Sequence, residues 1–391
     1  MFYIISFLII GISFSPLFLK VPDIWHCQGI FAQTVIMAAF AWSFIEKSKQ
    51  RLVSNWPLGC LIFWVGLQTA YICWQSQIEG RYDVKHFFPF FNFICLLILY
   101  QLIIQYLDKV KVEKILLFMK YVIIVTLFMC VLQKFGLAQF FDLLKDRPEN
   151  INNGKDLKWL NNPVVGFIGN GTHLSGFLGS TIPLFLWKSK REDWLALGLM
   201  ALVLMDCGTT IGMPSIAGVL TIFCVLVYWF KNKWLTLSAV IFFIGAVIGH
   251  FYGIEFFSAT GRIAIWKYYW GIFAKMPITG FGLGTVNILY PHTPIPDARH
   301  VHLEYLQYGV EIGIIGLVCI LGMVNQLFHM VAKDKTELCL KACILGFLIT
   351  GFLNYPSKLW LVSTWCIFWY AALFAIRNEE KIYGIESQRN N

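Results

Sequence analysis

The sequence predicts an all-α polytopic membrane protein with about twelve transmembrane helices, each near the 20 apolar residues that cross a bilayer. The first observation is composition: the 391 residues are 58% hydrophobic and 14% charged, and the mean hydropathy is +0.66. Soluble domains carry more charge than this. The second is that long apolar segments recur along the whole chain. The third is that lysines and arginines gather in alternate connections between these segments.

The apolar segments, taken in order, place each expected span. The first 20 residues lack a basic start and a small-residue cleavage site, so we expect a retained span and not a removed signal peptide. The seventh segment is the shortest of the set. The expected spans are 2–20, 29–46, 56–74, 86–106, 114–133, 164–187, 193–207, 211–230, 234–252, 303–328, 337–354 and 358–376.

The basic residues predict the orientation of these spans, because cytoplasmic connections carry an excess of lysine and arginine. All the clusters fall on one side if both termini are cytoplasmic. We therefore expect one integral membrane helical domain over residues 1–391, with outward-facing loops at 134–163 and 253–302 and a cytoplasmic tail at 377–391. The clusters are Lys47, Lys49 and Arg51; Lys109, Lys111 and Lys114; Lys188, Lys190 and Arg191; Lys231 and Lys233; Lys333, Lys335 and Lys341; and Arg377, Lys381 and Arg389.

The net charge of +9 does not indicate a nucleic-acid partner, because the basic residues lie in short connections where membrane orientation explains them. The cysteines lie mostly inside apolar segments and form no CxxC pair. We expect them to act as small buried side chains and not as disulfides or metal ligands.

The second long loop contains an apolar, aromatic stretch with basic residues at its edges. Ile263, Trp266, Trp270 and Phe273 follow steps of three and four residues, which predicts one apolar helical face. The stretch is short for a span, so we expect a helix in the membrane interface that ends at Pro277. The following GFGLGT, residues 280–285, lacks the flanking strand and helix of a dinucleotide site and predicts a tight turn.

Ionisable residues crowd the entry to the tenth span, in HTPIPDARHVHLEYLQYGVEIGIIG, residues 292–316. The HxH pair of His300 and His302 is compatible with zinc binding, but no third ligand stands at a suitable spacing, so we expect no metal. Glu311 lies inside the span, where an ionisable side chain is either functional or paired with a neighbouring helix. Gly313 and Gly316 are expected to let another helix approach closely.

These stretches carry a family resemblance. TGR-x3-W-x10-P-x2-GFGLGT, followed by His302, Leu306, Glu311, Gly313 and Gly316 as H-x3-L-x4-E-x-G-x2-G, resembles the O-antigen ligase and polymerase family of bacterial membrane glycosyltransferases. NPVVGFIGNGTHLSGFLGSTIPL, residues 162–184, is similar to the span before that family's central region.

The resemblance implies transfer of a glycan from an undecaprenyl-diphosphate carrier to a sugar hydroxyl. The acceptor would be lipid A–core for a ligase of lipopolysaccharide biosynthesis, or another repeat unit for a polymerase. It implies a metal-independent enzyme without a cofactor, in the bacterial inner (plasma) membrane, with its site on the periplasmic side. The expected partners are the lipid-linked donor, the glycan acceptor and membrane lipid.

The resemblance also selects two catalytic candidates. Arg262 matches the loop arginine, and a guanidinium can bind phosphate oxygens of the leaving group in a bidentate way. His302 matches the family's histidine, and an imidazole can take the proton of a sugar hydroxyl near neutral pH. The alternatives are an arginine that snorkels to headgroups and a polar residue at a helix start. Arg299, His300, Lys267 and Glu311 are the candidate substrate-binding residues.

One departure from the family bears on the site. Many members carry a second arginine near the eighth span, whereas residues 207–218, CGTTIGMPSIAG, contain none. Its replacement is expected among Arg299, Arg147, Lys267, Lys275 and His173.

A polysaccharide or secondary transporter is the alternative function. Transporters place coupling charges in their spans and repeat their halves. The candidates for such charges here are Asp206 and Glu311.

Overall fold

The computed structural model describes residues 1–18, 24–45, 55–78, 87–135, 164, 171–205, 207, 216–234, 237–238, 241, 260–289, 301–352, 354 and 356–389. Within these ranges the regular structure is helical, as expected of a chain whose backbone polar groups must be satisfied inside a bilayer. The helices are α1 (Phe2–Phe18), α2 (Ile24–Ile45), α3 (Trp56–Ile78), α4 (Phe87–Tyr106), α5 (Lys109–Lys134), α6 (Gly171–Leu186), α7 (Arg191–Met205), α8 (Ile216–Phe230), α10 (Thr260–Phe273), α11 (Thr285–Leu289), α12 (Glu304–His329), α13 (Lys335–Thr350), a short 3-10 helix (Pro356–Lys358) and α14 (Trp360–Arg389).

These helices confirm the all-helical prediction. Four are long and apolar enough to cross a membrane: Phe88–Tyr106, Lys109–Lys134, Glu304–His329 and Trp360–Glu379. Four shorter apolar helices lie at Phe2–Ser15, Gln28–Phe44, Trp56–Ile72 and Gly218–Phe230. The expected span 234–252 falls almost entirely outside the described residues. The count of about twelve spans, at roughly 20 residues each, stays a prediction.

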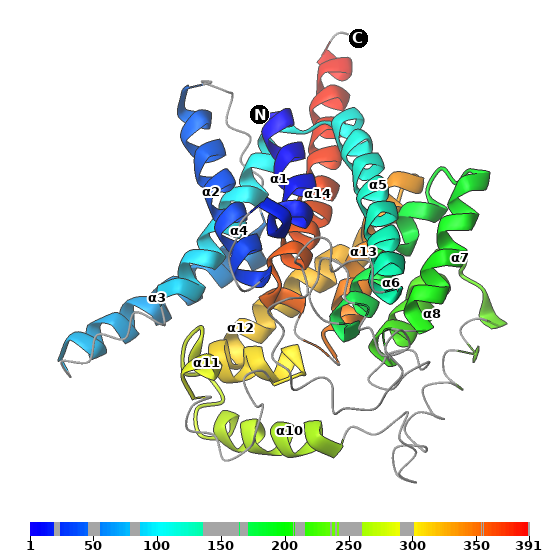
Figure 1. The fold of residues 1–391 in the computed structure, drawn as a ribbon. Helices are drawn as coiled ribbons and strands as arrows, with labels where there is room; N and C mark the ends of the chain where they lie inside the picture. Colours follow the sequence, from blue (N-terminus) through cyan, green and yellow to red (C-terminus); the bar gives the residue numbers. More distant parts are fainter. Residues whose placement is uncertain are drawn as a thin grey trace.

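The main core gathers around α14, which stands among α1, α2, α4, α5 and α13 (Figure 1). Trp365, Phe368 and Trp369 of α14 are fully buried there. The Trp365 indole N–H donates to the carbonyl of Ile9 in α1, at 3.2 Å. The large aromatic side chains of α14 therefore fill the space between the first and last thirds of the chain.

Helices α6, α8 and α13 pack closely through small residues. A Cβ on Gly346 of α13 would come within 2.6 Å of the Cα of Ser180 in α6. The hydroxyls of Thr221 in α8 and Thr350 in α13 are 3.0 Å apart. Small side chains and hydroxyl pairs of this kind join helices where lipid supplies no hydrophobic force.

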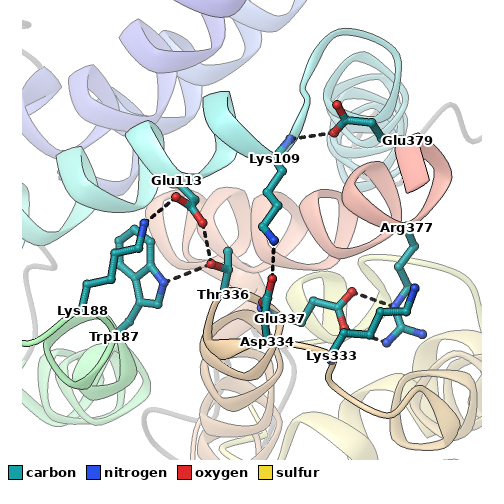
Figure 2. Close-up of polar contacts among 10 residues, drawn as sticks. All are labelled: Lys109, Glu113, Trp187, Lys188, Lys333, Asp334, Thr336, Glu337, Arg377 and Glu379. Atoms are coloured by element: carbon teal, nitrogen blue, oxygen red, sulfur yellow. Dashed lines mark hydrogen bonds and ion pairs between the residues drawn. The ribbon is translucent and has the colours of Figure 1, made fainter. Parts of the chain in front are cut away.

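A network of polar side chains joins α5, α13 and the residues after α6 at one end of the bundle (Figure 2). The Lys109 ammonium is 2.5 Å from the Asp334 carboxylate. Glu113 accepts from the Lys188 ammonium at 2.5 Å and from the Thr336 hydroxyl at 2.8 Å. Asp334 also caps α13 by accepting from the backbone N–H of Glu337 at 2.9 Å.

The same network reaches α14. Glu337 accepts from the Arg377 guanidinium at 2.8 and 3.1 Å and from the backbone N–H of Lys333 at 2.9 Å (Figure 2). The Glu379 carboxylate accepts from the backbone N–H of Lys109 at 2.9 Å. Basic residues that are far apart in sequence thus share one end of the bundle.

Helix α10 packs on the N-terminal part of α12. It lies across the end of the bundle that is opposite to the polar network (Figure 1). The polar network begins where α12 ends and α13 starts. Gly351, just after α13, accepts from the backbone N–H of Glu304 at the start of α12, at 2.8 Å. Helices α12 and α13 are therefore antiparallel, and the start of α12, the end of α13 and α10 share one end.

Candidate functional site

Helix α12 is broken at Gly313, whose backbone is non-helical at φ 67 and ψ −174. The loop after α10 fills the break and pairs with the freed backbone groups. Phe281 and Gly282 donate their N–H groups to the carbonyls of Val310 and Glu311 at 2.9 and 2.7 Å. Unpaired backbone groups at membrane depth each cost several kcal/mol, so the loop makes the break possible.

Hydrogen bonds from α12 to the loop complete the pairing. Ile314 and Ile315, beyond the break, donate to the carbonyls of Pro277 and Ile278 at 2.8 and 3.3 Å. Two side chains of α3 also donate hydrogen bonds to backbone carbonyls at this junction. Trp64 donates to the Ile312 carbonyl at 2.9 Å. Gln68 donates to the carbonyls of Thr279 and Glu311 at 2.7 and 2.9 Å.

The glycines of the sequence motif are explained by this junction. Gly280 has φ +68, and a Cβ there would lie 2.5 Å from the Gly313 nitrogen and 2.7 Å from the Glu311 carbonyl oxygen. Gly313 has φ +67, and its added Cβ would collide with the Ile278 carbonyl. The expected turn at residues 280–285 is confirmed.

The expectation that a helix approaches Gly313 is wrong, and at Gly316 the atoms nearest to an added Cβ belong to α12 itself. A loop backbone approaches Gly313. The space over Gly316 is taken by the Ile312 side chain of the same helix.

Helix α10 is held on α12 by one buried face. Ile265 and Tyr269 of α10 pack with Leu306 and Val310 of α12 in a small apolar cluster. The opposite face of α10 is exposed, including Ile263 and Trp270, which are 42% and 60% exposed. The expected apolar face at 263, 266, 270 and 273 is therefore split, because Trp266 and Phe273 pack on the cluster while Ile263 and Trp270 do not.

The packing of α10 on α12 brings Arg262 and His302 into electrostatic reach. Arg262 lies in the first turn of α10 and is half-buried. His302 directly precedes Leu303, the N-cap of α12, with a left-handed backbone at φ 56. Left-handed backbone is uncommon for residues other than glycine. The charge of Arg262 thus acts on a residue 40 positions away in the chain, at one end of the bundle.

The surroundings of His302 keep its imidazole neutral. Burial lowers the pKa of His302 from 6.5 to about 4, and the positive charge of Arg262 acts in the same direction. The ring is therefore uncharged at neutral pH and can accept a proton. An anion bound at Arg262 would offset the guanidinium charge and raise the pKa of His302, which would strengthen it as a base.

A buried polar stripe runs along α12, which follows His302 in the chain. Glu304, Gln307, Tyr308 and Glu311 follow helical spacing on one face. Glu304, Gln307 and Glu311 are buried, with exposed fractions of 4%, 1% and 0%. Polar residues at this helical spacing inside an apolar span are the sequence signal for the stripe, although Glu311 alone among them is a sequence-predicted site residue.

The 3-10 helix between α13 and α14 faces this stripe. Ser357 donates its backbone N–H to Glu304 at 3.0 Å. The Lys358 ammonium lies 3.1 and 3.4 Å from the two oxygens of Glu311, which also accepts from Gln307 at 3.2 Å. Glu311 is thus paired across helices, and Lys358 is the partner that the sequence did not identify.

The other candidates lie apart from this centre or outside the described residues. Lys267 and Lys275 are exposed on and just after α10. His173 of α6 is buried beside a crevice that Thr350 and Pro356 also line, which is too narrow for a water molecule. The remaining candidates, Arg147, Asp206, Arg299 and His300, fall outside the described residues. In the described ranges, His, Cys, Asp and Glu side chains form no group that could hold a metal ion.

The fold and this site define a class: a helical membrane protein with an arginine and a neutral histidine at one end of its bundle. The chain also carries a recognisable family region. A family model described as O-antigen ligase matches residues 175–321, from α6 into the second half of α12. The match confirms the resemblance to the O-antigen ligase family. No curated protein matches the chain in sequence.

The matched range contains Arg262, His302, Glu311 and both glycines of the helix break. The family indicates a glycosyltransferase-like enzyme that transfers glycan in polysaccharide biosynthesis.

Proposed function

We propose that the protein transfers a glycan from an undecaprenyl-diphosphate-linked donor to a sugar hydroxyl in assembly of a cell-envelope polysaccharide. The observation that carries the proposal is the approach of Arg262 to His302 inside the region that matches the family. The pair supplies one anion ligand and one neutral base, which are the two groups that such a transfer requires.

In the proposed reaction the bond between the anomeric carbon and the diphosphate oxygen breaks. The acceptor's hydroxyl oxygen forms the new bond to that carbon, and its proton passes to the imidazole of His302. The lipid diphosphate leaves as an anion beside Arg262. Because the approaching anion raises the pKa of His302, donor binding prepares the base.

Further substrate contacts are proposed for the residues around this pair. Lys267 on the exposed face of α10, together with Arg299 and His300 before His302 in the sequence, would meet the charged carrier. Glu311 is fully buried and bonded to Lys358, so its contribution would come through that lysine. No metal takes part in the proposal, because a guanidinium supplies the positive charge.

The proposed setting is the bacterial inner membrane. About twelve spans of roughly 20 residues would place both termini, the tail 377–391 and the polar network of Figure 2 on the cytoplasmic side. The loop 253–302, Arg262 and His302 would then face the periplasm, where lipid A–core or a growing glycan is the acceptor. The whole chain 1–391 would form one membrane domain.

The proposal is tested by deleting the gene in the native host and separating surface polysaccharide on a gel. The deletion strain is complemented with wild type, His302→Asn or Arg262→Lys. Asparagine tolerates the left-handed backbone but cannot act as the base. His329→Asn and Arg191→Lys, at exposed positions, are the matched controls.

Wild type and both controls are expected to restore the glycan pattern, and the two site variants, inserted at equal level, are expected to fail. An acceptor without glycan in the deletion strain indicates a ligase, and a single added unit indicates a polymerase. Full restoration by His302→Asn refutes the assigned base and favours a transporter.

A further inference from the structure

The polar stripe of α12 has hydrogen-bonding capacity that its neighbours in the structure do not use. The side-chain oxygen of Gln307 is buried and accepts no hydrogen bond within the described part of the chain. The same holds for the side-chain oxygen of Gln68, whose nitrogen donates to the Glu311 carbonyl. Buried polar atoms without partners are rare in folded proteins and call for an explanation.

Lys358 offers the complementary donor. Its ammonium carries three protons, and within the described residues it donates to the two oxygens of one carboxylate, that of Glu311. Its side chain is 21% exposed while that of Glu311 is 0% exposed. The lysine therefore connects the buried stripe with the surface beside the start of α12.

The charges of the stripe select against an anionic ligand. Glu311 neutralises Lys358, and Glu304 adds a second buried carboxylate that accepts from Ser357. A phosphate at this position would meet no uncompensated positive charge, because Lys358 is already paired with Glu311. A neutral group that both donates and accepts fits the unused atoms, and a sugar hydroxyl is such a group.

The stripe lies beside the proposed centre. Gln307 follows Glu304 by three residues, a rise of about 4.5 Å along the helix. Glu304 follows His302 by two residues. Gln307 therefore lies within about two helical turns of His302 along the chain, at the same end of α12.

We propose that Gln307, Glu311 and Lys358 form a subsite that binds a neutral sugar through its hydroxyl groups. Gln307 accepts from one hydroxyl, Lys358 donates to one, and Glu311 holds both side chains in place. This inference rests on the proposed function, because it assigns the subsite to the donor or acceptor glycan of that transfer.

The test uses Gln307→Met, which keeps the length of the side chain and removes its hydrogen-bonding atoms. The matched control is Gln326→Met. Gln326 lies in the other half of α12, and its side-chain oxygen is also buried without a hydrogen bond to described residues. Both variants are purified in detergent with wild type, and their melting temperatures establish that each is folded.

The first readout is transfer, with lipid-linked glycan and acceptor extracted from the native host and each varied in turn. Gln307→Met is expected to raise the KM for one of the two by tenfold or more, with Gln326→Met near wild type. The substrate whose KM changes identifies the occupant as donor or acceptor sugar. Unchanged KM values in a folded Gln307→Met protein overturn the subsite.

The second readout is independent of catalysis. Saturation-transfer NMR records binding of the free oligosaccharides released from the same donor and acceptor. Wild type and Gln326→Met are expected to give signals that Gln307→Met loses. If Gln307→Met loses the binding signal but wild type shows no transfer, the subsite is supported and the proposed function is refuted. Signals equal in all three proteins overturn the subsite, and the unused atoms of the stripe are then assigned to ordered water.

Discussion

The junction between the loop 277–282 and the break in α12 makes a quantitative prediction for Gly280→Ala. The alanine Cβ would lie 2.5 Å from the Gly313 nitrogen and 2.7 Å from the Glu311 carbonyl oxygen, both backbone atoms. Neither atom can move without shifting a helix end. The residue must also keep φ near +68, which glycine adopts freely and alanine does not.

The expected cost is the sum of two effects. A left-handed backbone costs a residue with a Cβ about 1–2 kcal/mol. Moving the loop away to relieve the contact weakens at least the neighbouring hydrogen bonds from Phe281 and Gly282, each worth about 1 kcal/mol. Gly280→Ala should therefore reduce the free energy of unfolding by about 3 kcal/mol, within a factor of two.

The assay is unfolding in detergent micelles, followed by tryptophan fluorescence during heating and during titration with denaturant. Gly271→Ala is the matched control, because Gly271 is helical and a Cβ there meets no atom within 4 Å. That change should be neutral or should stabilise the protein by up to about 1 kcal/mol. Equal stability of Gly280→Ala and wild type would refute the description of the junction.

Three further predictions concern other charged groups. Because burial and Arg262 lower the pKa of His302 to about 4, kcat/KM should fall as the pH drops through that value. The residual activity of Arg262→Gln should show this limb nearer 6.5, and a limb that stays in place contradicts the coupling. The Lys120–Asp193 pair is 2.6 Å long with side chains 7% and 8% exposed, so Lys120→Met should destabilise by about 3–5 kcal/mol. Adding Asp193→Leu should restore much of that loss in the same denaturant titration, whereas additive losses would show no coupling. Glu337→Gln should lower the melting temperature, since the Glu337 side chain is 1% exposed and paired, and an unchanged value would assign the network of Figure 2 no role in stability.

The helices could be predicted from the sequence because each is an apolar run bounded by charged residues. α5 begins after Asp108, whose side chain caps it by accepting from Lys111 at 2.9 Å. α13 begins after Asp334 in the same way. Local signals of this kind need no tertiary information, so α12 at Glu304–His329 agrees closely with the expected span 303–328. The end of α14 does not agree, because this helix continues to Arg389, well past the expected end at 376.

The break in α12 could not be predicted. Gly313 and Gly316 are small residues inside an apolar span, which favours close helix packing. Only the pairing of the loop 277–282 with α12 shows that Gly313 interrupts the helix. The partner of Glu311 depended on the same long-range geometry. Lys358 is 47 residues away in the chain, and no local pattern connects it with Glu311.

The approach of Arg262 to His302 likewise follows from the packing of α10 on α12. The family resemblance named both residues, but composition and spacing alone gave no reason for them to meet. Ile265 and Tyr269, which hold α10 in place, stand on a face that the apolar pattern of the sequence did not select.

The most direct test of the central claim is transfer by the purified protein. Wild type, His302→Asn and His329→Asn are placed in lipid nanodiscs with lipid-linked glycan and acceptor from the native host, without an ion gradient. Enzymatic transfer predicts a glycosylated acceptor and free lipid diphosphate in equal amounts for wild type and His329→Asn, and neither product for His302→Asn. Two results would contradict the central claim. One is equal transfer by His302→Asn and wild type. The other is no transfer by purified wild type although the same gene restores the glycan pattern in the deletion strain.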